Sequence, residues 1–175
     1  MKRQVLVFCL FACLLAIPFT AHAQYKFGYL NYKALLTSMP EYVEGQKSLQ
    51  EIRQKYEAET KHNEEVFNKM YTDYLQGQKD FPQTIMLKRQ SELQNEMEKG
   101  IKFRDEVKRL LEKAETDLTA PAKELLDSAI VWVGNEKGYE YILNTENNSY
   151  PFIHSGAGED ATPYVQERLK ALRHE

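Results

Sequence analysis

The side chains that could catalyse a reaction or hold a metal are sparse in this sequence of 175 residues. His62, His154 and His174 stand far apart along the chain, without the spacing that metal-binding histidines use. Both cysteines, Cys9 and Cys13, fall in an N-terminal segment that we expect to be removed. The sequence therefore predicts no metal site and no thiol chemistry.

Motifs for nucleophilic attack or phosphate binding are also missing. Asp127-Ser128 and His154-Ser155 are ordinary dipeptides. The glycines of the segment GAGED, residues 156–160, are not followed by the strand-to-helix GxxxxGK motif of a phosphate loop. We therefore expect a protein that is not an enzyme and that uses no cofactor.

Aromatic and methionine side chains are suited to non-covalent contact with a partner chain. A tyrosine ring offers an apolar face with a hydrated hydroxyl, and a methionine adapts to many shapes. The candidates for contact with a partner chain are Tyr71, Phe81, Met86 and Phe103. The alternative is that such residues join two helices to each other, and we favour that interpretation for Tyr56, Phe67 and Tyr74.

Basic residues are concentrated in one part of the chain. Residues 77–113 contain nine basic and seven acidic side chains, whereas 41–76 contain five and eight, and 114–175 contain five and eleven. The basic patch consists of Lys88, Arg89, Lys99, Lys102, Arg104, Lys108 and Arg109. It favours contact with acidic partners or lipid headgroups, and the alternative is a solvated helix face with interspersed acids.

The N-terminus has the features of a secretory signal peptide. A positive start precedes a short apolar core at residues 5–19 and the small-x-small cleavage site AHA at 21–23. An uncleaved membrane anchor is the alternative, but the apolar run meets Pro18 and falls short of the ~20 residues that span a membrane. A lipoprotein that keeps Cys13 is a weaker alternative. We predict a signal peptide at residues 1–23 and export of the mature chain.

The mature chain is mildly acidic and has no cysteine. Loss of Lys2 and Arg3 leaves 21 of the 23 basic residues against 26 acidic ones, a net charge of −5. This charge argues against nucleic acid as the main partner. Without disulfides, the chain must be stabilised by packing or by association.

Two long helices occupy the middle of the sequence. Residues 41–76 lack proline and carry a narrow apolar stripe, interrupted at Glu59 and Asn63, that is typical of a coiled-coil contact. A break at 77–82 precedes a second helix from about residue 83, and the two predict an antiparallel hairpin with arms ~55 Å long. The apolar positions of the second helix are Met86, Leu93, Met97, Ile101, Val107, Leu111, Ala114, Leu118, Leu125 and Ala129.

Strand-forming segments lie at the two ends of the mature chain. Apolar and polar residues alternate as in a strand at 25–31 and at 138–144, and a short third strand is expected at 151–155. The segment GAGED is expected to be a loop. Thr162 is the expected cap of a final helix. We predict an α+β fold in which 24–40 and 121–175 form a small β-containing body and 41–120 form a helical arm. So small a body with open strand edges requires association. The residues that we assign to the association body are Phe27, Tyr29, Tyr141 and Leu143.

Pro121 interrupts the second helix at the predicted boundary between arm and body. A proline within a helix removes a backbone hydrogen bond and costs about 3 kcal/mol. One interpretation is a kink that turns Leu125, Ala129, Ile130 and Val133 onto the sheet. The alternative is a separate helix capped by Thr119. Both place a joint at the same position.

Three segments together resemble the Skp/OmpH family of periplasmic outer-membrane-protein chaperones. They are GYLNYKALLTSMPEY at 28–42, PAKELLDSAIVWVGNEKGYEYIL from Pro121, and GEDATPYVQERLKAL near the C-terminus. The resemblance implies a periplasmic homotrimer that holds unfolded outer-membrane β-barrel proteins between its helical arms without ATP. Known members are strongly basic, so the acidic charge of this chain disfavours binding to anionic lipid or lipopolysaccharide.

Two other functional classes compete with a chaperone. A structural or adaptor coiled coil of the envelope predicts a more regular heptad stripe than the chain has, with its interruptions at Glu59, Asn63, Gly100 and Arg104. A surface lipid-binding protein is disfavoured by the negative net charge, and we expect at most weak membrane contact.

Overall fold

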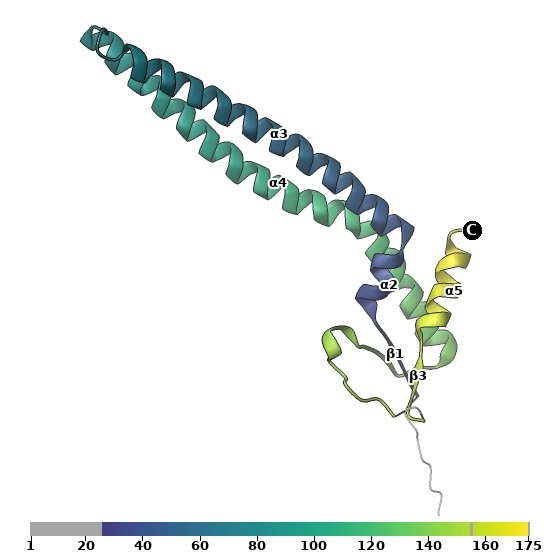
Figure 1. Cartoon of the computed structure of the whole chain (residues 1–175). Helices are drawn as coiled ribbons and strands as arrows, with labels where there is room; N and C mark the ends of the chain where they lie inside the picture. The colour runs from purple at the N-terminus through teal and green to yellow at the C-terminus, as the bar shows by residue number, and fades with distance from the viewer. Residues whose placement is uncertain (1–25, 155, 175) are drawn as a thin grey trace, which may run out of the picture.

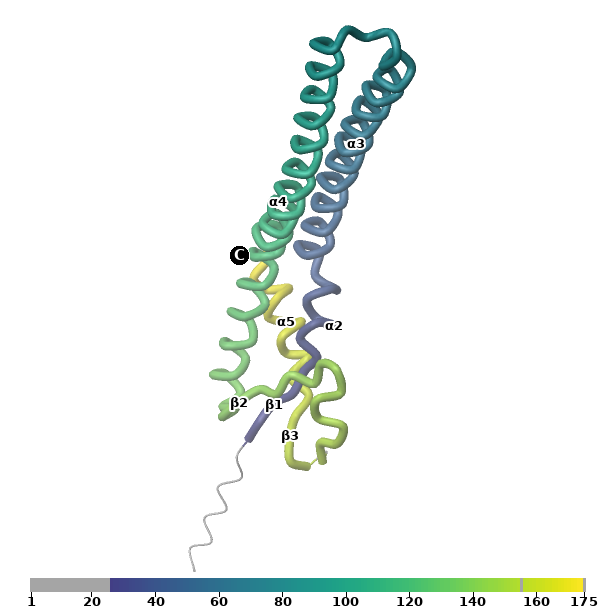
Figure 2. Tube along the Cα trace, turned by 90° about the vertical axis from the view of Figure 1, so that its left-hand side faces the viewer, coloured from purple at the N-terminus to yellow at the C-terminus, as the bar shows by residue number. Residues whose placement is uncertain are grey.

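The computed structural model describes residues 26–154 and 156–174 (Figure 1). The predicted signal peptide lies outside these residues. A small sheet and three helical segments form a body, from which two long helices project as a hairpin (Figures 1 and 2). The fold is the predicted α+β class, with the sheet built from both ends of the chain.

Three parallel strands make up the sheet. Strand β1, Phe27–Leu30, lies between β2, Tyr141–Asn144, and β3, Gly158–Asp160. Phe27 is in register with Tyr141 on one side and with Gly158 on the other. The first and last parts of the described chain therefore meet on neighbouring strands.

The prediction of a third strand at 151–155 is wrong, because the third strand starts within the segment expected to be a loop. Gly158 pairs with Phe27 at a point where a Cβ atom would lie 2.4 Å from the Phe27 ring. Only glycine can approach so closely. The glycine-containing segment that resembles a loop therefore supplies the strand.

The hydrophobic core lies between one face of the sheet and the helices of the body. Asn31 caps helix α2, Tyr32–Ser38, by accepting the Ala34 N–H at 2.9 Å. Helix α5, Thr162–Leu172, and the end of α4 supply the other side of the core. The buried cluster consists of Leu30, Leu35, Leu36, Met39, Ala122, Leu126, Ala129, Val133, Ala161, Val165 and Leu169.

Capping of α5 differs from the expectation. Thr162 is the first helical residue and not the cap, and its N–H is accepted at 2.9 Å by Oδ1 of Asp160, the last residue of β3. The prediction of Thr162 as the capping side chain is therefore wrong. Asp160, two residues earlier, accepts the first helical N–H instead, because an aspartate side chain can accept from the backbone N–H two residues ahead.

The arm consists of helix α3, Pro40–Gly77, and the outer part of α4, Gln83–Lys137. At 1.5 Å per residue, the 38 residues of α3 extend about 57 Å. Gly45 lets the helices meet closely at the base, because a Cβ there would lie 2.5 Å from the carbonyl oxygen of Leu118. Figure 1 shows the hairpin extending away from the body and not folded over the sheet.

Pro121 lies inside α4, which continues without a break to Lys137. Thr119 does not cap a separate helix, so that alternative is wrong; its hydroxyl donates to the carbonyl oxygen of Glu115 at 2.8 Å. Beyond the proline, Leu126, Ala129 and Val133 are fully buried. The direction of α4 changes where the arm meets the body (Figure 1), as the kink interpretation requires.

Candidate interaction surfaces

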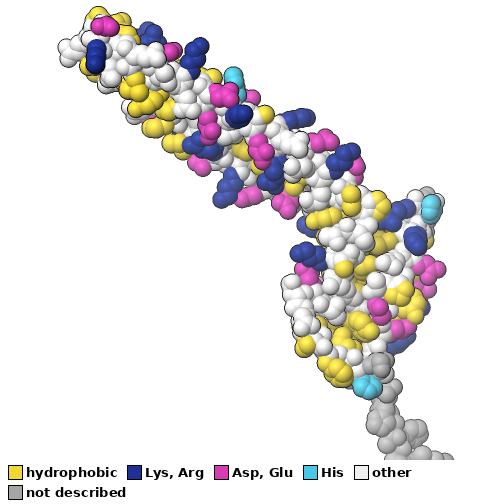
Figure 3. Space-filling model, viewed as in Figure 1, with side chains coloured by type: hydrophobic (Ala, Val, Ile, Leu, Met, Phe, Trp, Pro, Cys, Tyr) yellow, Lys and Arg dark blue, Asp and Glu magenta, His cyan; other side chains and the backbone are white. Residues whose placement is uncertain are grey.

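Apolar side chains are scattered over the arm among charged ones (Figure 3). Those with large exposed areas on the arm beyond its base are Tyr71, Leu75, Ile85, Leu87, Met97 and Ile101. Most belong to the outer half of the hairpin. The arm thus presents several exposed apolar side chains interspersed with charged ones.

The four candidate contact residues have different surroundings. Tyr71 is 47% exposed and stacks on Phe67, with ring centroids 6.2 Å apart. Phe81 lies 6.5 Å from Tyr74 at the turn, and a Cβ on Gly77 would lie 2.4 Å from the Phe81 ring. These contacts leave Tyr71 the more accessible of the two aromatic rings.

Phe103 and Met86 are half-buried. The Phe103 ring meets the Tyr56 ring edge to face between the helices, at 6.4 Å. Both aromatic partners therefore belong to the contact between α3 and α4. Tyr56 has the helix-joining role that its spacing predicts.

Two of the apolar positions of the second helix, Met97 and Ile101, are not buried between the helices. Both are exposed, while Gly100 and Phe103 are half-buried at neighbouring positions. Apolar residues of the second helix are spaced three or four positions apart from Val107 onward, and this regular spacing does not continue through the segment around Met97. The sequence feature that indicates this irregularity is Gly100, a helix-weakening residue between the two apolar positions.

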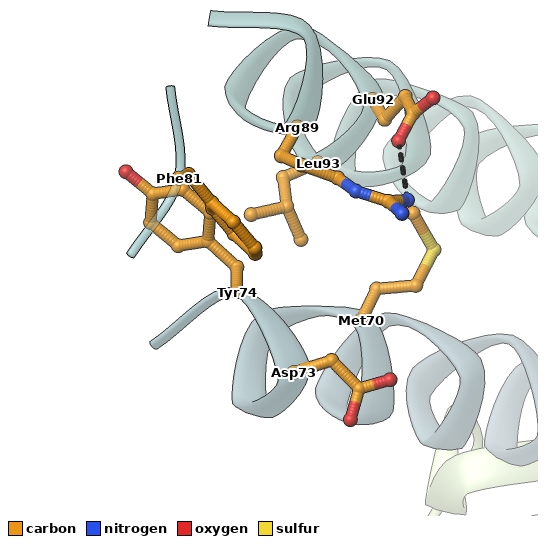
Figure 4. Close-up of a pocket in the computed structure, with 7 residues that line it drawn as sticks. All are labelled: Met70, Asp73, Tyr74, Phe81, Arg89, Glu92 and Leu93. Carbon is orange, nitrogen blue, oxygen red and sulfur yellow. Dashed lines mark hydrogen bonds and ion pairs between the residues drawn. The ribbon is translucent and has the colours of Figure 1, made fainter. Parts of the chain in front are cut away.

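A small pocket lies near the tip of the arm, between the ends of α3 and α4 (Figure 4). Its volume is about 120 Å³. The Arg89 side chain extends between the helices beside Met70 and donates to Glu92 at 3.0 Å. Tyr74 accepts a hydrogen bond from Gln90 at 2.9 Å next to it. The tip pocket is therefore small, and both charged and apolar side chains line it.

A larger hollow, the mid-arm groove, lies between the helices at 60–68 and 96–104 and has a volume of about 260 Å³. A second hollow of about 240 Å³ continues it toward the body and shares Thr60 and Glu64 with it. The two hollows follow one side of the hairpin. They expose the interior of the helix contact where its apolar stripe is interrupted.

The basic patch consists largely of paired side chains. Lys88 and Arg89 lie 3.8 and 3.0 Å from Glu92, and Lys99 lies 3.2 Å from Glu96. Arg104 pairs with Glu64 of the facing helix at 3.6 Å, and Arg109 pairs with Glu106. Among the described residues, Lys102 and Lys108 have no carboxylate within 4.0 Å. Binding of acidic partners by this patch stays a prediction.

The association residues line one face of the sheet, opposite the core. Phe27 and Tyr29 are half-buried, and Tyr141 is 48% exposed and stacks on Phe27 at 5.3 Å. Leu143 lies two positions after Tyr141 in β2 and is in register with Tyr29, so it belongs to the same face of the sheet. Parallel sheets are usually covered on both faces, so this face, the association face, is unusually open.

A hydrogen-bonded cluster joins β3 to α5 and to the residues that precede β1 and β2. Glu159 of β3 accepts from the hydroxyls of Tyr164 at 2.6 Å and Tyr139 at 2.7 Å, and Lys26 lies 3.6 Å away. The two tyrosine hydrogen bonds hold the pKa of Glu159 below its ordinary value. Burial and the neighbouring carboxylate raise the pKa of Tyr139, so both groups keep their usual charge.

A second cluster fixes the joint between arm and body. Tyr32 of α2 donates to Asp127 of α4 at 2.9 Å, and burial together with that carboxylate raises the pKa of Tyr32 to about 12. Arg173 donates twice to Glu41 at the start of α3. The hydrogen bonds from Arg173 lower the pKa of Glu41.

Neither a metal centre nor a membrane span is found in the described part of the chain. No three potential ligands among His, Cys, Asp and Glu gather in residues 26–154 and 156–174. No helix in those ranges has the length and hydropathy to cross a bilayer.

Comparison with known proteins gives one family match. The sequence model of the family described as "Outer membrane protein (OmpH-like)" matches residues 26–169, which include both ends of the sheet and the whole arm. No curated protein matches the chain.

Proposed function

The chain belongs to the OmpH-like (Skp) family, and from this membership we propose that it is an ATP-independent holdase for unfolded outer-membrane β-barrel proteins. The family consists of non-enzymatic chaperones of the periplasm. Periplasmic action requires export, for which the predicted signal peptide at residues 1–23 would serve.

The projecting arm is the observation that carries the proposal. Beyond its base, the arm holds six exposed large apolar side chains of the described residues, interspersed with charged ones, on a hairpin that projects away from the body. Burial of apolar surface contributes about 25 cal/mol per Å², so each such contact is weak and many together are useful. A guest held by many weak contacts stays disordered and loses little chain entropy.

A homotrimer gives these arms a shared interior. The association face and the two outer strands would lie between protomers, which would cover the apolar side of a parallel sheet and its open edges. Three arms around one axis would then enclose a client. Phe27, Tyr29, Tyr141 and Leu143 are the residues that we expect at this interface.

The basic patch has a lesser part in this proposal. Five of its seven cations already face a carboxylate, which leaves Lys102 and Lys108 for acidic segments of a client. Membrane contact through so few charges would be weak, since each contributes about 1 kcal/mol at an anionic surface.

Dilution of a urea-denatured barrel protein into buffer tests the proposal. The mature protein should suppress the rise in light scattering without nucleotide, with saturation near one client per trimer. No protection at several-fold trimer excess contradicts the holdase function. Pull-down from envelope extract separates it from an adaptor, which would retain one folded partner in fixed ratio and not many unfolded barrels.

A further inference from the structure

We propose that the mid-arm groove binds a single aromatic side chain from an uncharged, extended segment of a client, and that Gly100 keeps the groove open for it. This inference rests on the proposed function for the identity of the client. It adds a defined site on each arm to a binding mode otherwise made of diffuse contacts.

The groove has the size and lining for one side chain. Its 260 Å³ fall below the ~300–1,000 Å³ of small-molecule pockets. Phe67 of α3 and Phe103 of α4 form two aromatic walls, and Met97 lies on the rim, 50% exposed. Aromatic and thioether groups favour an aromatic guest over an aliphatic one of the same area.

Gly100 has no explanation in the packing of the hairpin. A Cβ at this position would meet nothing within 4 Å, whereas at Gly45 it would lie 2.5 Å from the backbone of α4. Glycine inside a helix costs roughly 0.5–1 kcal/mol relative to alanine. The arm thus bears a destabilising residue that leaves space open beside Met97 and Phe103.

The charged side chains on the rim of the groove are paired with one another, so the groove favours an uncharged guest. Glu64 lies 3.6 Å from Arg104, and Glu96 lies 3.2 Å from Lys99, so each carboxylate has its own cation. An anionic or cationic guest would have to break one of these pairs. Asn63 and Asn68 line the same groove and can hydrogen-bond the backbone of an uncharged segment.

The second hollow fits the geometry of a barrel strand. The midpoints of the two hollows are between five and six residues apart along α3 and nine residues apart along α4, or roughly 8 and 14 Å. Side chains i and i+4 on one face of an extended strand are separated by ~13 Å. Outer-membrane strands alternate apolar with polar residues and carry aromatic girdles, so one segment can fill both hollows while its polar side chains stay in water.

Methyl NMR of the exported, processed protein tests this site. Met39, Met70, Met86 and Met97 remain after removal of the signal peptide, and each can carry a ¹³C-methyl label. Met97 lines the groove, Met70 lines the tip pocket and Met39 is buried in the body. The probe is an uncharged alternating peptide of ~10 residues, one barrel strand long, with phenylalanine at positions i and i+4.

We expect the peptide to shift the Met97 methyl resonance and leave those of Met39 and Met70 unchanged. The same peptide with serine in place of both phenylalanines should not shift it. Gly100→Leu, which fills the groove, should weaken peptide binding about tenfold, since the aromatic loses at least ~1.5 kcal/mol of burial. Asn95→Leu is the matched control, because Asn95 is exposed and lies ~140° around α4 from Gly100.

The possible outcomes distinguish failure of the groove as a binding site from failure of the proposed holdase function. Equal shifts at all four methionines, a shift at Met70 alone, or no shift overturns the groove as a binding site. Equal affinity of Gly100→Leu and wild type also overturns it, even if both suppress aggregation. A groove that binds the peptide in a protein that gives no protection supports the site and contradicts the holdase function instead.

Discussion

Arg173, at the end of α5, holds Glu41, in the first turn of α3, in a two-pronged ion pair. The guanidinium Nε donates to Oε1 at 2.7 Å and Nη2 donates to Oε2 at 2.9 Å, across 132 positions of sequence. Both side chains are about 30% exposed. The base of the arm is thereby tied to the last helix of the body, next to the joint at Pro121.

Arg173→Ala should lower the free energy of unfolding by about 1 kcal/mol, because a bidentate, partly buried pair is worth more than an exposed one. Urea denaturation at neutral pH measures this change. Glu41→Gln should have a similar effect, and the double variant should be little worse than either single one. Additive losses would mean that the two side chains stabilise the protein separately.

The Glu159 cluster predicts that the body weakens in acid. The pKa of Glu159 is lowered by its tyrosine partners, so its contribution is complete above the ordinary glutamate pKa of ~4.3 and is lost as pH falls through the lower folded-state value. Glu159→Gln should therefore lower the free energy of unfolding near neutral pH. Between about pH 5 and about pH 3, the free energy of unfolding of this variant should fall less steeply than that of the wild type.

Glu106→Gln is the control for that experiment. Arg109 lowers the pKa of Glu106 too, but both side chains of this pair are at least half exposed on one face of α4. Its removal should leave the thermal midpoint almost unchanged at every pH. An equal response of the two variants would mean that general charge, and not the tyrosine cluster, sets the acid sensitivity.

Two glycines of the arm should respond in opposite directions to alanine. Gly45→Ala places a methyl group against the backbone of Leu118 and should destabilise by about 1–3 kcal/mol. Gly100→Ala meets open space and should stabilise by about 0.5–1 kcal/mol through helix propensity. Thermal unfolding of the two variants beside wild type checks both signs, and destabilisation by Gly100→Ala would mean that the groove closes in solution.

Local signals in the sequence predicted the hairpin and its joint. The break at 77–82 and the apolar stripes of the long helices are set by residues that are close together in sequence. A proline disturbs a helix through its own backbone, so Pro121 indicates the joint without help from distant residues. The third strand could not be predicted, because Gly158 is defined by contact with Phe27, 131 positions earlier. The exposure of Met97 depends on a similar long-range relationship: the facing residues of α3, and not the stripe of α4, decide which side of α4 turns inward.

The pairing of Glu41 with Arg173 was likewise beyond sequence reasoning. Both residues are ordinary charges at helix ends, among 49 charged side chains in the chain. Only the placement of α5 beside the start of α3 selects them as partners. The same holds for Glu159, which collects Tyr139 and Tyr164 from different elements.

Substitution on the association face should separate assembly from folding. Tyr141→Lys puts a charge on the apolar sheet face where the side chain is 48% exposed, so the protomer should keep its fold while self-association weakens strongly. Sedimentation equilibrium measures the mass, and circular dichroism reports the helix content. Val131→Lys is the matched control, because Val131 is an exposed apolar residue of α4, on the body's opposite, helical side.

We expect Val131→Lys to sediment as wild type does and Tyr141→Lys to sediment at the mass of one protomer. The physical reason is the desolvation of a lysine between apolar surfaces, which costs several kcal/mol when no carboxylate is near to pair with it. If Tyr141→Lys kept the wild-type mass, the open sheet face would not be the interface. Loss of association in Val131→Lys alone would instead place the interface on the helices of the body.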